Sequence, residues 1–140
     1  MISKARKNAD KGGYRNVEFR LGEIESLSVA NDTADVIISN CVINLSPDKP
    51  RVYSEAFRAL KPGGRLAVSD VVAFAELPEE AKKDLTLYSG CISGASMIFE
   101  VENMLRSAGF EHISVRPVGV SKSFIRTWRN VSMKVRHHCV

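Results

Sequence analysis

Hydrophobic and polar residues follow patterns that predict several short strands. Residues 17–21 alternate strictly between apolar and polar side chains, as a strand does. Residues 34–39 are instead a short, β-branched and nearly continuous apolar run, and 65–72 are predicted as a second strand of this kind. Such runs are typical of strands covered on both faces, and hence of a parallel sheet. A further strand is predicted over 112–116, and 123–125 is a candidate for one more.

Helical spacing predicts four helices around these strands. The second helix has the clearest start, with Ser46 as N-cap, Pro47 at the first helical position and Asp48 beside the helix dipole. Glycine follows the first and last helices at 12–13 and 109, where it favours a helix end. The helices are expected over 2–11, from 46 to the Pro-Gly-Gly at 62–64, over 78–87 and over 101–107. Strands that alternate with helices through short loops indicate an α/β, doubly wound sheet.

The composition fits a globular protein with one domain. The chain has 140 residues, of which 44% are hydrophobic and 26% are charged. These fractions exclude a wholly disordered, low-complexity or collagen-like chain. No apolar stretch approaches the roughly 20 residues that cross a bilayer, and residues 1–11 lack the apolar core of a signal peptide. We therefore expect a cytoplasmic protein with no membrane partner.

The net charge of +4 is concentrated near the C-terminus. No acidic residue follows Glu111, and the basic residues after it are Arg116, Lys122, Arg126, Arg129, Lys134 and Arg136. Because these six exceed the net charge, the rest of the chain carries −2. We interpret 118–140 as a basic tail, either one more strand or, as we favour, solvated and disordered. The tail has few interleaved aromatic residues, so nucleic acid is not expected as a partner.

Polar residues follow the predicted strands at the points where ligands bind to open parallel sheets, outside the carboxyl ends of the strands. Gly22 allows close approach of the backbone, Glu23 can accept a hydrogen bond from an exocyclic amine, and Ile24 offers an apolar face to a flat ring. An ordinary loop with a solvated glutamate explains these three residues equally well. The segments that meet the rule are 22–25, 40–44 and 70–72.

The cysteines Cys41, Cys91 and Cys139 are too few and too dispersed for a disulfide framework. A lone buried cysteine is more often a small hydrophobic residue than a reactive one. Cys41, however, follows a buried strand, and Cys91 lies in a glycine-flanked loop. Two thiols from separate exit loops, if they converge, make a site for a soft, thiophilic centre. The terminal His-His-Cys at 137–139 is a weak signal, and no metal site is expected.

Three segments resemble the arsenite S-adenosylmethionine methyltransferases. They are 16–25 (Asn-Val-Glu-Phe-Arg-Leu-Gly-Glu-Ile-Glu), 38–45 (Ile-Ser-Asn-Cys-Val-Ile-Asn-Leu) and 60–65 (Leu-Lys-Pro-Gly-Gly-Arg). The last is shared by many class I methyltransferases. The second, together with the later Gly-Cys-Ile-Ser-Gly-Ala, is much more specific. The resemblance extends from Gly13 to about Pro117.

The resemblance implies a Rossmann-like class I methyltransferase fold, here an incomplete sheet with helices on both faces. It also implies transfer of the methyl group of S-adenosylmethionine to trivalent arsenic. The family's cysteines that match Cys41 and Cys91 bind the arsenic, so arsenite or a methylated arsenical is the expected partner. The residues that match Glu23 and Ile24 contact the adenine, and the segment around Asn40 lies near the methionine moiety. With Gly22, these are the expected cofactor-binding residues.

The sequence departs from the family on its N-terminal side. No Gly-x-Gly turn follows a strand, and the family's upstream arsenic-binding cysteines have no counterpart. We therefore interpret 1–117 as the C-terminal part of a methyltransferase domain, truncated on the N-terminal side. The tail does not match the family, so the resemblance assigns no role to Cys139.

The family's missing strands would sit between the first two strands predicted here. Their absence would leave the strand at 36–38 with an exposed apolar edge. We expect the chain to cover this edge as a homodimer or by pairing its own strands directly. Two functions stay open: a methyltransferase with weak cofactor affinity, or a non-catalytic remnant that binds arsenic through thiols or serves as a subunit of another protein.

Overall fold

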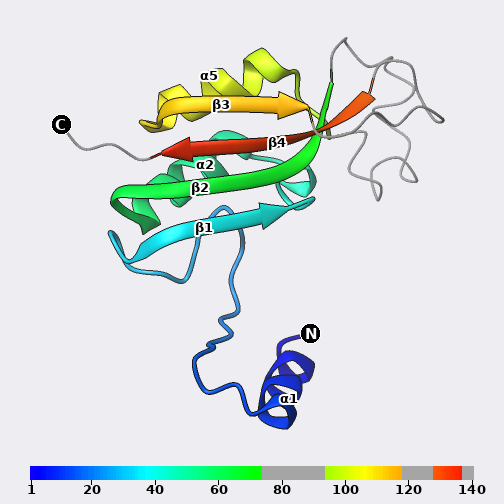
Figure 1. Cartoon of the computed structure of the whole chain (residues 1–140), viewed down its shortest axis with the longest axis vertical. Coiled ribbons are helices and arrows are strands. Elements are labelled where there is room, and N and C mark those ends of the chain that lie inside the picture. Colours follow the sequence, from blue (N-terminus) through cyan, green and yellow to red (C-terminus); the bar gives the residue numbers. More distant parts are fainter. Residues whose placement is uncertain (74–93, 118–127, 137–140) are drawn as a thin grey trace.

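A four-stranded sheet in the order β1-β2-β4-β3 is the frame of the molecule (Figure 1). The computed structural model describes residues 1–73, 94–117 and 128–136. β1 runs parallel to β2, and β4 is antiparallel to both of its neighbours. The strands are β1 (Ala34–Asn40), β2 (Leu60–Ala73), β3 (Glu111–Pro117) and β4 (Trp128–Arg136). The predicted strands at 34–39, 65–72 and 112–116 are confirmed.

The described helices confirm the expected α/β class. They are α1 (Ile2–Gly12), the 3-10 turn η1 (Ile43–Leu45), α2 (Lys49–Ala59) and α5 (Ile98–Ala108). Gly13 and Gly109 end α1 and α5 in the left-handed conformation, as their positions predicted. We expected helices on both faces of the sheet; in the described part of the chain, α2 and α5 pack against each other on one face. α1 lies apart from the sheet (Figure 1).

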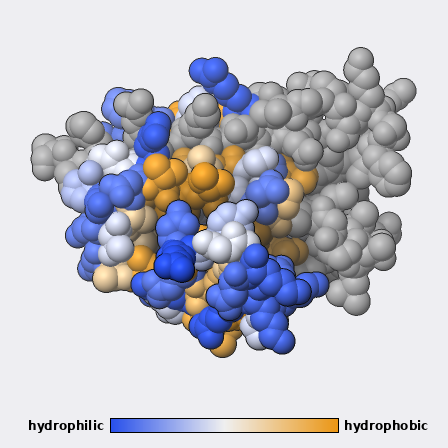
Figure 2. Space-filling view, turned by 60° about the horizontal axis from the view of Figure 1, so that its bottom comes forward, coloured by the Kyte–Doolittle hydropathy of each residue, from blue (hydrophilic) through white to orange (hydrophobic). Residues whose placement is uncertain are grey.

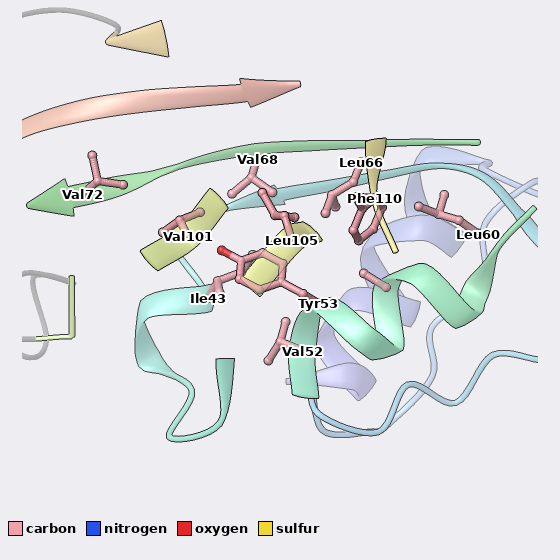
Figure 3. Packing of buried hydrophobic residues seen from close by; sticks show 11 residues of the cluster. Ile43, Val52, Tyr53, Leu60, Leu66, Val68, Val72, Val101, Leu105 and Phe110 are labelled. Atoms are coloured by element: carbon pink, nitrogen blue, oxygen red, sulfur yellow. The ribbon is translucent and has the colours of Figure 1, made fainter. Parts of the chain in front are cut away.

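The core lies between β2 and these two helices (Figure 3). Leu66, Val68 and Val72 occupy alternate positions of β2, and each is at most 2% exposed. Tyr53 of α2 and Leu105 of α5 meet them from the helices and are equally buried. The apolar residues of these three elements therefore form the core.

The start of α2 differs from the prediction. Asp48, not Ser46, is the N-cap, and its side chain accepts a hydrogen bond from the Arg51 backbone N–H at 3.1 Å. Pro50, not Pro47, is the proline of the first turn. The Ser46 hydroxyl is already engaged, because it donates to the Glu25 carboxylate and accepts from the Asp48 N–H. The serine therefore fixes the connection before the helix.

The strand predicted over 17–21 is wrong. No residue of this segment takes part in a strand, and Val17 and Leu21 are 48% and 84% exposed. Its backbone carbonyls at Phe19 and Leu21 accept from the Arg6 guanidinium and the Ser28 hydroxyl, not from a neighbouring strand. Alternating residues need a neighbouring strand and a buried face, and none of the described strands lies beside this segment.

β1 is an edge strand in the described sheet, because it pairs with β2 alone. Our expectation that it is covered on both faces is also wrong, because Val36 and Ile38, which share one face of the strand, are 43% and 80% exposed. β1 borders the lower side of the sheet in Figure 1, and Figure 2, which turns that side forward, shows hydrophobic side chains gathered among hydrophilic ones. The apolar edge that we expected at 36–38 is present.

Part of the basic tail belongs to the sheet. β4 pairs with β2 from Arg65↔Arg136 to Ala73↔Trp128, and on its other side with β3. Of the two alternatives for the tail, the further strand is present at 128–136 and the disorder that we favoured is wrong there, because these residues pair with β2 and, from Val131 to Arg136, with β3. The predicted helix over 78–87 and strand over 123–125 lie outside the described residues. No helix in the described part is long and apolar enough to cross a membrane.

Truncation of Leu105 tests the core. Leu105 is 0% exposed between α5 and the sheet, so Leu105→Ala should lower the free energy of unfolding by about 2–5 kcal/mol, through lost burial and an unfilled cavity. Phe99, on the same helix, is 57% exposed, so Phe99→Ala should change the free energy of unfolding by less than about 0.5 kcal/mol. Urea denaturation measures both. Equal effects would show that α5 does not pack as described.

Candidate functional site

Cys41 lies directly after β1, at the carboxyl end of the sheet. Its backbone N–H donates to the Ser69 carbonyl at 2.9 Å, which continues the pairing of β1 with β2 by one residue. Its φ is +51°, in the left-handed region that non-glycine residues seldom adopt. The side chain is exposed, and its thiol donates to the Asn40 side-chain carbonyl at 3.7 Å. Cys41 is therefore not a buried hydrophobic residue but a thiol presented at a strand exit.

A buried carboxylate holds the turn that follows Cys41. Asp70, 4% exposed at the end of β2, accepts from the Asn44 side-chain amide at 2.8 Å and from the Asn44 backbone N–H at 3.4 Å. The Asn44 amide also donates to the Val71 carbonyl at 2.7 Å. Burial raises the pKa of the Asp70 carboxyl, while backbone N–H groups of Val71, Asn44 and Ile43 act in the opposite direction.

This placement changes the role that the sequence gave to 70–72. We expected a polar group offered to a ligand, but Asp70 is turned inward and bonded to the turn over 43–45. A buried carboxylate is tolerated only when donors satisfy it. Asp70 therefore stabilises the conformation of the loop that carries Cys41.

The loop with the predicted adenine contacts is fastened to α2. Glu55, 5% exposed, accepts from the Leu27 backbone N–H at 3.0 Å and forms an ion pair with Arg58 at 2.8 Å. Arg58 in turn donates to the Val29 carbonyl at 2.9 Å. The hydrogen bond from Arg58 lowers the pKa of the Glu55 carboxyl, although burial acts against it. The loop is thus held by the helix rather than by a strand pairing.

A cavity of about 270 Å³ lies between this loop, β1 and α2. Ile24 and Asn40, both predicted to bind the cofactor, line it together with Ile38, Val42 and Tyr53. Its walls are mostly apolar, as befits a flat ring.

The remaining predicted site residues are not all brought to this cavity. Gly22 and Glu23 are exposed and do not line it, and the Glu23 carbonyl accepts from the Ser26 N–H in a tight turn. Cys41 follows the lining residue Asn40, whereas Cys91 lies outside the described residues. Among the described residues, no group of three or more His, Cys, Asp or Glu side chains is placed to hold a metal ion.

Sequence reasoning missed Asn44, Glu55 and the wall residue Tyr53. Asn44 lies in the strand-exit segment 40–44, but the local pattern shows neither its contact with Asp70 nor that of Glu55 with Leu27, because these partners are 26 and 28 residues away along the chain. Tyr53 lies on the buried face of α2, but the cavity beside it depends on the open edge of β1.

Comparison with known proteins gives a consistent set of relatives. A family model described as "Methyltransferase domain" matches residues 1–109. An arsenite methyltransferase of Halobacterium salinarum is 48% identical over 91% of this chain, and the human arsenite methyltransferase is 43% identical over 72%. The aligned part is 33% and 28% of those proteins, so the chain spans about a third of the length of these curated relatives.

Solved structures show the same fold. The arsenic(III) S-adenosylmethionine methyltransferase of Chlamydomonas reinhardtii superposes with a TM-score of 0.73 at 35% identity, over 94% of this chain and 48% of that one. Phosphoethanolamine N-methyltransferase 2 of Haemonchus contortus superposes with a TM-score of 0.80 at 14% identity, over 99% of this chain and 41% of that one. This is a likeness of fold alone.

The Glu55 anchor predicts a pH dependence of stability. Because the folded pKa of this carboxyl is lowered, its contribution is present above the unfolded value of about 4.3 and is lost as the pH falls through the folded pKa. Glu55→Gln should therefore be less stable than wild type at pH 7, and the difference should shrink in acid. Urea denaturation from pH 7 to 3 measures it, with Glu102→Gln on the surface of α5 as the control. A constant difference would contradict the anchor.

Proposed function

Because this chain belongs to the methyltransferase domain family and is related to the arsenite methyltransferases, as its sequence indicated, we propose that it carries the arsenic-binding part of an S-adenosylmethionine-dependent methyltransferase. The observation that supports this most is the exposed thiol of Cys41 at the carboxyl end of β1, next to the cavity lined by Ile24 and Asn40. Open parallel sheets bind their ligands at this end.

The chemistry of the site suits trivalent arsenic as a substrate. Arsenic(III) is soft and seeks thiolates, so Cys41 and Cys91 would hold it while its lone pair faces the cofactor. S-adenosylmethionine, when bound, supplies an electrophilic methyl group. The chain's contribution is to hold the arsenic in line, which removes translational entropy from the reaction and needs no proton shuttle.

We propose that this cavity takes up part of the cofactor. Its volume of about 270 Å³ lies just below the roughly 300–1,000 Å³ of pockets that enclose a whole small ligand. Ile24 would cover one face of the adenine, and Asn40 would lie toward the methionine end. Glu23 and Gly22, on the exposed turn before Ile24, would meet the outer edge of the ring.

A second candidate is a non-catalytic protein that binds arsenic through its thiols or serves as a subunit of another protein. The sequence contains no Gly-x-Gly turn with which to approach the cofactor's methionine end. On this account we expect weak cofactor binding by the chain alone. Calorimetric titration with micromolar or tighter affinity would contradict that expectation.

Arsenite binding and methyl transfer separate the two candidates. The purified chain should retain arsenite after desalting, at a ratio near one per chain, and Cys41→Ser and Cys91→Ser should each abolish this retention, whereas Cys139→Ser should not. Mass spectrometry of the bound arsenic measures it, and S-adenosylmethionine labelled in its methyl group reports transfer. Methylated arsenic supports the enzyme, and retention without methylation supports the arsenic binder. No retention by the wild type overturns both of these and leaves the subunit of another protein.

We also propose that a second copy of the chain covers the edge of β1. Two copies of this seven-residue strand, related by a two-fold axis, offer each other the same backbone donors and acceptors. The pairing would bring exposed Val36 and Ile38 of both copies together.

Charge placed on this edge tests the dimer. Wild type should have the mass of a dimer at micromolar concentration, and Ile38→Lys should shift it to a monomer, because a lysine at the seam resists edge-to-edge pairing. Light scattering after size exclusion measures the mass, and Phe99→Lys, on α5, is the control. A wild type that stays monomeric would rule out this pairing.

A further inference from the structure

The loop that presents Cys41 is held by buried polar contacts on two sides of Asn44. Asn44 is 6% exposed and lies three residues after Cys41. On the inner side, Asp70 accepts from both its backbone N–H and its side-chain amide. The residue of positive φ, Cys41, directly precedes this turn, so these contacts act within three residues of the thiol.

On the outer side, Gly94 presses against the backbone of Asn44. A Cβ atom built on Gly94 would lie 2.1 Å from the Asn44 carbonyl oxygen and 3.1 Å from the carbonyl carbon. No side chain fits in that space, so the contact requires glycine. The two chain segments are therefore in direct backbone contact at this point.

Lys49 of α2 keeps Gly94 in this place. Its ammonium donates to the Gly94 carbonyl and, at 2.8 Å, to the Ser96 hydroxyl. Burial lowers the pKa of Lys49, whereas the carboxylates of Asp70 and Glu100 raise it. A half-buried lysine with these partners is a fixed cross-link between α2 and the 94–96 segment, not a solvated side chain.

We propose that Asp70, Asn44 and Lys49 are positioning residues for Cys41. Together with Gly94 they form a polar junction that clamps the turn after β1 and holds Cys41 in its left-handed conformation. The effect on arsenic binding rests on the proposed function; the effect on the conformation of Cys41 does not.

The conformational effect can be measured on the thiol itself. In a Cys91→Ser, Cys139→Ser background, a nitroxide label attached to Cys41 should give an immobilised electron paramagnetic resonance spectrum. Lys49→Met, which keeps the length of the side chain but removes its donors, should make the label mobile, and Lys49→Arg should restore part of the immobilisation. Lys61→Met, which removes an exposed pair with Asp35, is the matched control and should change nothing.

The functional effect is measured on the chain with all three cysteines. Lys49→Met and Asp70→Asn should each weaken arsenite binding by about tenfold or more, the usual cost of removing a group that orients a ligand-bearing residue. Circular dichroism identifies variants that retain the fold, and Lys49→Met keeps the test available if Asp70→Asn does not fold.

The outcomes distinguish the two claims. An unchanged label spectrum in folded Lys49→Met overturns the positioning role. A mobile label in that variant, with no arsenite retained by the wild type, supports the positioning role and overturns the proposed function instead. A mobile label in Lys49→Met together with weakened arsenite binding supports both the positioning role and the proposed function.

Discussion

The hydrogen bonds between Asp70 and Asn44 join the end of β2 to the turn after β1, and the geometry of the site depends on them. A carboxylate buried to this extent is costly in free energy unless it is fully bonded, and here three backbone N–H groups and one amide satisfy it. All of these donors except the Val71 N–H come from the turn itself, so the turn cannot open without leaving a buried acceptor partly unsatisfied. The position of Cys41 is thus tied to the stability of the core.

α2 connects the core to every part of the site. Its apolar face supplies Tyr53 to the core, and its N-terminal residue Lys49 contacts the segment at 94–96. The helix also carries the buried Glu55 and its partner Arg58, which hold the loop at 27–29. Because one rigid helix makes all these contacts, the loop, the cavity and the turn after β1 keep fixed relative positions.

The sequence was sufficient for what depends on local pattern and insufficient for what depends on partners far along the chain. Spacing of apolar residues located α2, α5, β1 and β2, and the strand-exit rule located Cys41. The spacing did not show that β2 buries mainly one face, with Arg65 and Ser69 exposed on the other. The strand at 17–21 failed because alternation does not show whether a neighbouring strand exists. The choice of disorder over a further strand for the basic tail failed because charge does not exclude backbone pairing, which places 128–136 in the sheet. The contacts of Asn44 and Glu55 likewise arise only when distant residues are folded together.

The backbone of Cys41 has a consequence for the balance between stability and reactivity. A left-handed conformation costs a residue with a side chain about 1–2 kcal/mol, a cost that glycine avoids. Glycine would therefore have the lowest conformational free energy at position 41, but it carries no thiol. The molecule keeps a cysteine there at the expense of its own stability, so selection for a more stable loop would act against the thiol.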